Sequence, residues 1–259
     1  MGQAVLGSMK ALILGGTTEA MALSRLLSGH PAVTATVSLA GRTRHPVLPP
    51  LPTRIGGFGG VEGLKAHLTE EGIGAVVDAT HPFAHRISAN AAAACRAMNL
   101  PLLVLTRAPW MAGPGDRWIG VPDMVAAAET LRPLGRNIFL TIGRQELQPF
   151  EVVPDKNYLI RAVDPPEPMP NLPHRTLLLD RGPFTLESEL ALLSGHDIDA
   201  LVSKNSGGSA TEAKLAAARA RGIPVVMVER PPSNGVAEVH DPAAALAWLE
   251  GLIDHARVP

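Results

Sequence analysis

Short aliphatic runs alternate with Ala- and Leu-rich stretches along the whole chain. Apolar runs of about four to eight residues are typical of buried strands, and the longer stretches have the apolar spacing of helices. The predicted strands are residues 9–14, 33–39, 75–79, 101–106, 136–142, 158–163, 176–179, 200–203 and 225–228. One predicted helix ends at residue 27, and the others cover residues 61–71, 84–98, 186–193, 211–221 and 242–253. Residues 44–60 are predicted to form a loop. This alternation predicts an α/β fold with parallel sheets and helices on both faces.

The second half of the chain repeats the plan of the first half. Residues 99–107 match residues 222–230, and the same spacing of 123 positions places residues 80–83 on residues 203–206. We therefore expect two similar α/β domains, residues 9–132 and 133–259, with a ligand cleft between them. Residues 1–8 precede a second methionine and are interpreted as a cloning remnant outside the fold.

Composition narrows the class of protein. Hydrophobic residues make up 46% and aromatic residues 3% of the chain, and the net charge is −1. These values predict an aliphatic core and argue against nucleic-acid binding. The single cysteine, Cys95, excludes an internal disulfide and a cysteine-based zinc site. The sequence shows neither a membrane-span pattern nor a signal-peptide pattern, so we expect a cytoplasmic protein without membrane partners. Its helices are mostly charged and lack large apolar patches, so we expect a monomer.

The first candidate site is the turn after the first predicted strand, which contains Gly15, Gly16, Thr17 and Thr18. A glycine turn between a strand and a helix lets backbone N–H groups approach a phosphate. The turn lacks the full three-glycine pattern of dinucleotide sites. A plain tight turn with a threonine helix cap is therefore an equal alternative for these residues alone.

The end of the second predicted strand favours a nucleotide. It contains Ser38, Ala40, Gly41, Arg42 and Thr43. NAD-preferring sites commonly have an acidic residue here, whereas hydroxyl groups and a guanidinium suit the 2′-phosphate of NADP. Together with the glycine turn, these residues predict NADP as the cofactor, although a surface arginine in a loop would look the same.

A third polar segment follows the strand at 75–79. It contains Asp78, Ala79, Thr80, His81 and Phe83. His81 is a candidate proton donor or hydrogen-bond donor to a substrate, and an ordinary helix-entry turn is the alternative. His81 and His85 lack the glutamate of a zinc motif, so no metal site is expected.

Polar loops in the second half occupy matching positions. The candidate residues are Thr141, Arg144, Gln145, Arg161, Lys204, Asn205, Ser206, Gly207 and Lys214, and Arg107 in the first half adds a further cation. Cations, hydroxyls and backbone amides of this kind bind carboxylates or phosphates. These loops are therefore predicted to bind an anionic ligand.

Taken together, these segments resemble one family. They are GGTTEA at 15–20, SLAGRT at 38–43, GGFGG at 56–60, DATHPFA at 78–84, LTIGRQEL at 140–147, RGPF at 181–184, SKNSGG at 203–208 and VMVERP at 226–231. Over residues 9–255 the chain resembles the precorrin-6A reductase family of cobalamin (vitamin B12) biosynthesis. The segments at 78–84 and 203–208 are the specific ones.

The resemblance implies two Rossmann-like domains, with the possibility that a terminal strand is exchanged between the halves. It implies that NADPH gives a hydride to C19 of a tetrapyrrole, that C18 is protonated, and that precorrin-6B forms. Residues 15–18 and 38–43 would hold the cofactor, residues 78–81 would lie near the nicotinamide, and the Arg144 and 204–208 loops would face the substrate or the reactive end of the cofactor. His81 and Lys204 are the candidate proton donors, with bound water equally plausible. Phe83, Trp110 and Phe184 would contact the macrocycle.

Two alternatives stay open at this point. One is a reductase of the cobalt-containing substrate of the anaerobic route, which the motifs do not separate from the metal-free one. The other is a non-catalytic dinucleotide-binding sensor, which would keep the glycine turn and Arg42 but would not need the polar loops at 141–145 and 203–208.

Overall fold

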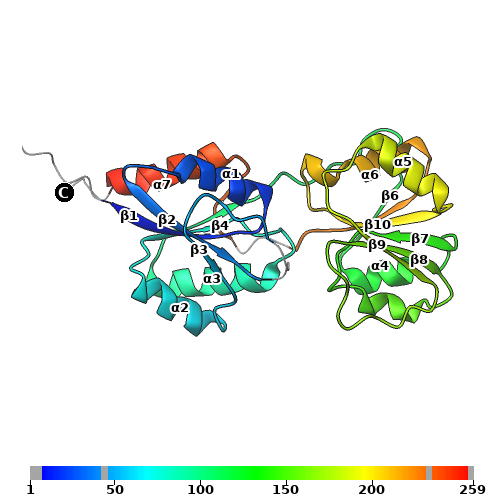
Figure 1. Cartoon of the computed structure of the whole chain (residues 1–259), viewed down its shortest axis with the longest axis horizontal. Coiled ribbons are helices and arrows are strands. Elements are labelled where there is room, and N and C mark those ends of the chain that lie inside the picture. Colours follow the sequence, from blue (N-terminus) through cyan, green and yellow to red (C-terminus); the bar gives the residue numbers. More distant parts are fainter. Residues whose placement is uncertain (1–7, 42–45, 232–234, 256–259) are drawn as a thin grey trace, which may run out of the picture. The chain divides into compact units, whose positions relative to one another are not determined.

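The computed structural model describes residues 8–41, 46–231 and 235–255, without the side chain of residue 255. The chain forms two compact units (Figure 1). The first unit combines the segment up to Arg107 with the segment from residue 232 onward, and the second unit is Ala108–Pro231. This division differs from the expected boundary after residue 132, because residues 108–132 pack with the second unit.

The first unit is built on a parallel sheet. Within the described residues its strands are β1 (Met9–Leu14), β2 (Val33–Leu39), β3 (Thr53–Ile55), β4 (Ala75–Asp78), β5 (Leu102–Leu105) and β12 (Glu238–Val239). Their order is β12-β5-β4-β1-β2-β3, and every neighbouring pair is parallel. This is a Rossmann-like order with its switch point between β1 and β4, so ligand-binding loops are expected at the carboxyl edge there.

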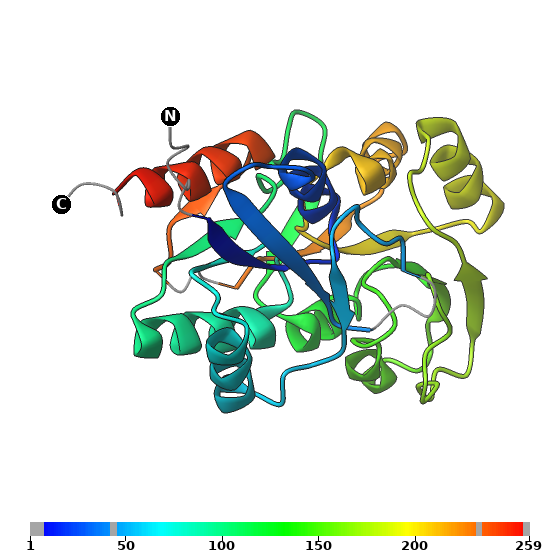
Figure 2. The same ribbon diagram turned by 60° about the vertical axis from the view of Figure 1, so that its left-hand side comes forward.

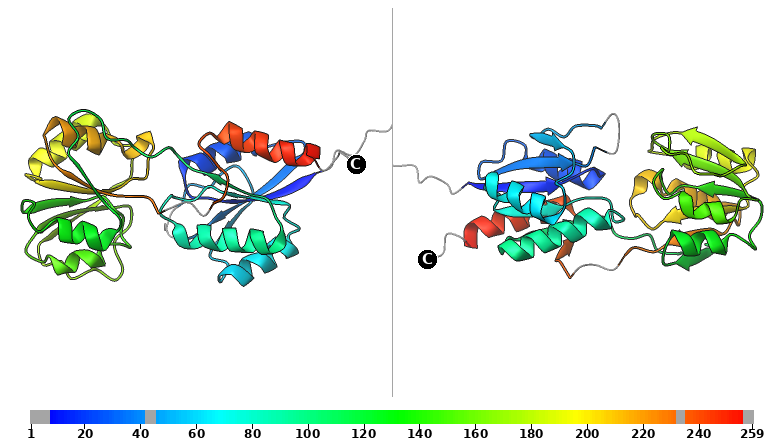
Figure 3. Two further views of the ribbon diagram at one scale, coloured as in Figure 1. Left: turned by 180° about the vertical axis from the view of Figure 1, so that it is seen from behind. Right: turned by 90° about the horizontal axis from the view of Figure 1, so that it is seen from below.

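Helices cover both faces of this sheet. They are α1 (Thr18–Leu27), α2 (Val61–Glu70), α3 (His85–Met98) and α7 (Pro242–His255). Ala11 and Ile13 of β1 pack in one apolar cluster with α1 and α7, which lie on the same face (Figure 2). Leu12 and Leu14 pack in a second cluster with α2 and α3 (Figure 3). A strand that is buried on both faces reads as a continuous apolar run, which is why β1 was predictable.

The second unit has the same strand order. Its strands are β6 (Trp118–Val121), β7 (Asn137–Leu140), β8 (Asn157–Ala162), β9 (Arg175–Leu179), β10 (Ala200–Lys204) and β11 (Val225–Val228), arranged as β6-β11-β10-β7-β8-β9. Its helices are α4 (Met124–Thr130), α5 (Leu186–Gly195), α6 (Ala213–Ala220) and the short 3₁₀ helices η1 (Gln148–Val152) and η2 (Ser209–Thr211). All of its neighbouring strands are parallel as well.

The two units have exchanged their last strand and helix. β6 directly follows the strands of the first unit in the sequence, yet it pairs with β11 of the second unit. β12 follows β11 in the sequence, yet it pairs with β5 of the first unit, and α7 packs on α1. The second unit is therefore a continuous segment placed between β5 and β12 of the first.

Most predicted elements are confirmed within one or two residues. The structure adds three short strands, β3, β6 and β12, that the sequence did not indicate. β3 lies inside the expected loop at 44–60 and has only three residues. In the part of the chain that the structure describes, no helix has the length and apolar character needed to span a bilayer.

Candidate active site

The turn between β1 and α1 requires glycine at two positions. A Cβ atom on Gly15 would lie 2.8 Å from a side-chain carbon of β2, and Gly16 has a φ of 119°. Thr17 caps α1, because its Oγ1 accepts the Ala20 N–H at 3.1 Å and donates to the Ala79 carbonyl at 2.8 Å. The turn thus ties the start of α1 to the end of β4. The first N–H groups of a helix have no acceptor within it and are suited to an anion.

Ser38 and Arg54 lie next to each other at the ends of β2 and β3. They are register partners, and Arg54 Nη1 donates to Ser38 Oγ at 2.8 Å. The other candidates of this region are Ala40, Gly41, Arg42 and Thr43. Ala40 and Gly41 are exposed, whereas Arg42 and Thr43 lie outside the described residues, so their predicted contact with a 2′-phosphate stays a prediction.

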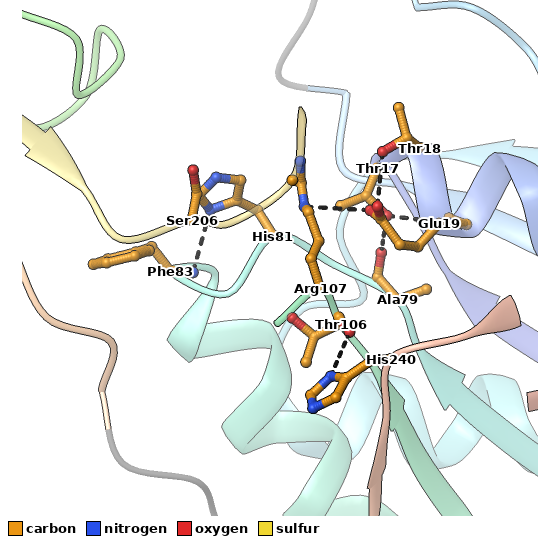
Figure 4. A network of polar contacts seen from close by, with 12 residues as sticks. Thr17, Thr18, Glu19, Ala79, His81, Phe83, Thr106, Arg107, Ser206 and His240 are labelled. Carbon is orange, nitrogen blue, oxygen red and sulfur yellow. Dashed lines mark hydrogen bonds and ion pairs between the residues drawn. The ribbon is translucent and has the colours of Figure 1, made fainter. Parts of the chain in front are cut away.

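The turn after β4 holds the Asp78 carboxylate and the His81 imidazole through hydrogen bonds to its own backbone. Asp78 is buried, and its Oδ1 accepts the backbone N–H and the hydroxyl of Thr80 at 3.1 and 2.6 Å, so this carboxylate shapes the turn. His81 Nδ1 accepts the Phe83 N–H at 3.2 Å, and the two rings lie 5.8 Å apart (Figure 4). Since Nδ1 is the acceptor, the neutral ring carries its proton on Nε2. His81 is therefore held in the tautomer that can donate through Nε2.

Arg107 lies against the N-terminus of α1. Its Nε is 3.4 Å from Glu19 Oε2, and Thr18 Oγ1 donates to Glu19 Oε1 at 2.9 Å (Figure 4). Arg107 thus balances an acidic group in the first turn of α1, at the place where a phosphate would otherwise meet that carboxylate. The predicted contact of Arg107 with a substrate stays a prediction.

Thr106 and His240 stand at the ends of β5 and β12. His240 Nδ1 lies 2.9 Å from the Thr106 carbonyl oxygen, which can only accept, so Nδ1 carries the proton (Figure 4). Thr106 is only 7% exposed, and its buried Oγ1 has no hydrogen-bond partner among the described residues. A buried hydroxyl without a partner is unusual and fits a place where a ligand supplies the missing hydrogen bond.

In the second unit, two loops at the carboxyl edge are joined by an ion pair. Lys204, at the end of β10, pairs with Glu146 of the turn after β7. Arg144 in the same turn donates to a backbone carbonyl at 3.1 Å, and the Thr141 hydroxyl donates to a carbonyl of β10 at 2.9 Å. Gln145 is exposed. The structure therefore places Lys204 and the 141–145 candidates at the same carboxyl edge of the sheet, and their contact with a substrate stays a prediction.

The loop after β10 is shaped by its own backbone contacts. The side-chain amide of Asn205 binds the main chain of Trp110, and Arg230 donates to the carbonyls of Asn205 and Ser206 at 2.8 and 3.0 Å. Gly207 has a φ of 68° and packs against the backbone of residue 108. Asn205 therefore serves the loop, and Arg230 is the cation that fixes it.

Two predicted cations have surroundings that differ from the expected ones. Arg161 is 7% exposed, pairs with Glu189 of α5 and lies 3.7 Å from the centroid of the Phe184 ring. Lys214 is 4% exposed, and its ammonium lies 5.1 Å from the centroid of the Trp110 ring. Withdrawing such charges from their partners is costly, so we leave both out of the proposed substrate site.

Comparison with known families decides the relationship. The family model of precorrin-6x reductase CbiJ/CobK matches residues 10–250. The chain belongs to this family. A solved CobK precorrin-6A reductase has a TM-score of 0.88 and 46% identity, over 94% of this chain and 96% of that chain.

Curated members of the precorrin-6x reductase family match along nearly the whole chain. The precorrin-6A reductase of Rhodococcus erythropolis is 52% identical over 93% of this chain and 97% of its own length. That of Rhodobacter capsulatus is 48% identical over 96% and 98%. The cobalt-precorrin-6A reductase of Priestia megaterium is 30% identical over 85% and 90%.

Four residues of this family member were missed as candidates by the sequence analysis. They are Arg54, Glu146, Arg230 and His240. Glu146 and Arg230 lie inside the segments on which the family resemblance rests. Both are charged residues close to the end of a predicted strand, and this position is the signal by which they could have been chosen. Arg54 belongs to a short strand and His240 directly follows another; neither strand has a detectable apolar period, and nothing in the sequence indicated that these residues lie at the carboxyl edge.

Proposed function

We propose that this protein reduces precorrin-6A to precorrin-6B with NADPH. The observation that supports this most strongly is the 48–52% identity, along more than nine-tenths of the chain, with proteins named precorrin-6A reductase. The lower identity of 30% with a cobalt-precorrin-6A reductase favours the metal-free substrate. A cytoplasmic location and a monomeric state belong to the same proposal.

The first unit fits a dinucleotide. The N-terminus of α1, opened by Gly15 and Gly16, would bind the pyrophosphate through backbone N–H groups, with Arg107 balancing Glu19. Ser38 at the end of β2 would lie near the adenosine ribose. The unpartnered Thr106 hydroxyl would bind the nicotinamide end. When bound, NADPH would supply the hydride for C19 of the macrocycle.

The second unit would bind the carboxylates of the substrate. A precorrin carries acetate and propionate groups, which need cations and amide donors. Arg144 and Lys204 stand on one carboxyl edge, where Glu146 keeps the Lys204 ammonium in position until a substrate carboxylate competes for it. Arg230 fixes the carbonyls of the 205–206 loop, so the backbone amides of that loop are preorganised.

His81 is our proposed source of the proton for C18. Its Nδ1 accepts the Phe83 N–H, so the ring keeps one orientation and presents the Nε2 proton. Lys204 is the weaker candidate, because its ammonium is already paired with Glu146. Bound water is the remaining alternative.

The test is turnover with defined substrates. Purified protein is mixed with NADPH and precorrin-6A, and nicotinamide absorbance and product mass are followed together. We expect NADPH consumption that requires precorrin-6A and yields a product two mass units heavier. Activity on cobalt-precorrin-6A alone would favour the anaerobic-route alternative. NADPH binding without turnover of either substrate would favour the sensor alternative.

A further inference from the structure

Arg54 is a cation held in a fixed position beside the end of β2. Its Nη1 donates to Ser38 Oγ at 2.8 Å and to the Gly56 carbonyl at 3.0 Å, and its Nη2 donates to the Gly57 carbonyl at 3.1 Å. One face of the guanidinium stacks on Phe58, with 3.9 Å from Cζ to the ring centroid. These four contacts therefore fix a side chain that is ordinarily flexible.

The charge of Arg54 is not balanced by a carboxylate. Among the described residues, its polar partners are a hydroxyl and two carbonyls, and no ion pair with an acidic side chain is formed. Burial without such a partner lowers the pKa of this guanidinium. A preorganised cation of this kind binds an anion strongly, because it gains a charge partner without losing much side-chain entropy.

Open space lies beside this guanidinium. A Cβ atom built on any of Gly56, Gly57, Gly59 or Gly60 would meet no atom within 4 Å. The glycine-rich loop after β3 therefore leaves room for a ligand next to Arg54. In a sheet with this strand order, the ribose of a bound adenosine lies beyond the end of the second strand, and β3 is the neighbour of that strand.

We infer that Arg54 binds the 2′-phosphate of NADP and is a specificity-determining residue of this chain. The inference rests on the proposed function, since it requires that the first unit bind a dinucleotide. Ser38 and the Gly56 and Gly57 carbonyls orient the guanidinium, and Phe58 covers one of its faces. Its remaining N–H groups bind the phosphate oxygens. The ligand chemistry is a phosphomonoester on a ribose 2′-oxygen.

The experiment measures two nucleotide fragments that differ only in the 2′-phosphate. Dissociation constants of 2′-phospho-ADP-ribose and ADP-ribose are determined by calorimetry for the unmodified full-length protein, Arg54→Gln, Arg54→Lys and the exposed control Arg25→Gln. We expect Arg54→Gln to reduce the preference for the 2′-phosphorylated fragment by at least about tenfold. Arg54→Lys should keep part of the preference, and Arg25→Gln should keep all of it.

Three results would overturn the inference in different ways. An unchanged preference in Arg54→Gln would show that another group binds the phosphate. An equal loss of affinity for both fragments would show that Arg54 only supports the glycine loop. Failure of both fragments to bind the unmodified protein would refute the proposed function itself, and the role of Arg54 with it.

Discussion

Asn205 binds the main chain of Trp110 from both sides. Its Oδ1 accepts the Trp110 N–H at 2.8 Å, and its Nδ2 donates to the Trp110 carbonyl at 3.0 Å. The side-chain amide thus pairs with the Trp110 backbone as a neighbouring strand would, and it joins the segment after Arg107 to the loop after β10. An asparagine in a polar loop of this kind looks like a ligand-binding residue in the sequence, but its hydrogen bonds are used within the protein.

Asn205→Ala should therefore destabilise the second unit. The substitution leaves a partly buried N–H and a carbonyl without partners, which costs about 2–3 kcal/mol. Urea unfolding measures the effect, with the exposed Asn171→Ala as the control in the same unit. Unaltered stability combined with lost substrate affinity would contradict this account and return Asn205 to the substrate site.

Two glycines of the second unit should respond differently to alanine. Both have positive φ, but a Cβ atom on Gly207 would lie 2.1 Å from the Ala108 carbonyl oxygen, whereas one on Gly143 meets nothing within 4 Å. Gly143→Ala should cost only the left-handed backbone penalty, about 1 kcal/mol, and Gly207→Ala should cost more, because the backbone must also move. Thermal unfolding of the two variants gives the comparison. Equal losses of stability in the two variants would mean that the backbone at residue 108 moves away from the added Cβ atom at no cost.

The ion pair between Asp116 and Arg219 should stabilise the second unit above acidic pH. Arg219 donates two hydrogen bonds to the Asp116 carboxylate, each at 2.8 Å, and these hold the pKa of Asp116 below its usual range. The unfolded chain therefore takes up a proton first, so this contribution is present above about pH 4 and is lost as pH falls through the lowered pKa.

Asp116→Asn should cost about 1–3 kcal/mol near neutral pH and progressively less in acid. The control is Glu129→Gln, which breaks the exposed pair with Arg132 and should leave the stability nearly unchanged at every pH. Urea unfolding at several pH values measures both. Equal effects of the two substitutions would show that the burial of Asp116 adds nothing.

Cys95 should be inert in the folded protein. Burial, and secondarily the charge of Asp78, raise the pKa of its thiol to about 11. At about pH 8 an aromatic disulfide reagent should therefore react only after denaturant is added. Because the folded pKa is raised, the contribution of this thiol to stability is complete below its ordinary pKa and is lost as pH rises toward 11. Rapid labelling of the native protein would show that α3 opens readily.

His81→Gln should lower kcat about 100-fold and leave KM for the substrate nearly unchanged, because a proton donor acts in the transition state. His85→Gln is the matched control, since His85 is exposed at the first residue of α3. Steady-state kinetics with precorrin-6A measure both variants. Full activity of His81→Gln would exclude His81 as the proton donor and leave Lys204 or bound water as the source.

The sequence predicted the elements whose strands are buried on both faces. Runs such as 11–14 and 225–228 are apolar at every position, because both faces of each sheet are covered. β3 and β12 have three and two residues, too few for any period to show. The domain boundary after residue 132 was expected from the internal repeat. The local sequence pattern does not indicate which of the two sheets a strand joins. β6 and β12 each pair with the sheet of the other half.

Candidate site residues were predicted where polar residues follow a strand directly. The glycine turn, His81 and Lys204 were chosen in this way, and their roles in binding and catalysis stay predictions. Arg161 has an ion-pair partner that the sequence did not indicate, because alternate side chains of a strand point to opposite faces and the Arg161 side chain points toward Glu189 of α5. Arg54 was missed because its strand was missed. The ion pair between Lys204 and Glu146 was not predicted, because residues that are distant in the sequence show no local pattern that indicates their contact.

The exchange of β6 and β12 determines which of the two sheets can be completed first during translation. Every element of the second unit has left the ribosome once residue 231 is clear of the exit tunnel, so that unit can complete its sheet first. The sheet of the first unit keeps β5 as an open edge during this time, because β12 and α7 follow every element of the second unit in the sequence. The nascent chain therefore carries the first unit with an unpaired β5 edge until β12 has been made, and a ribosome that stalls before residue 238 leaves that edge exposed to aggregation.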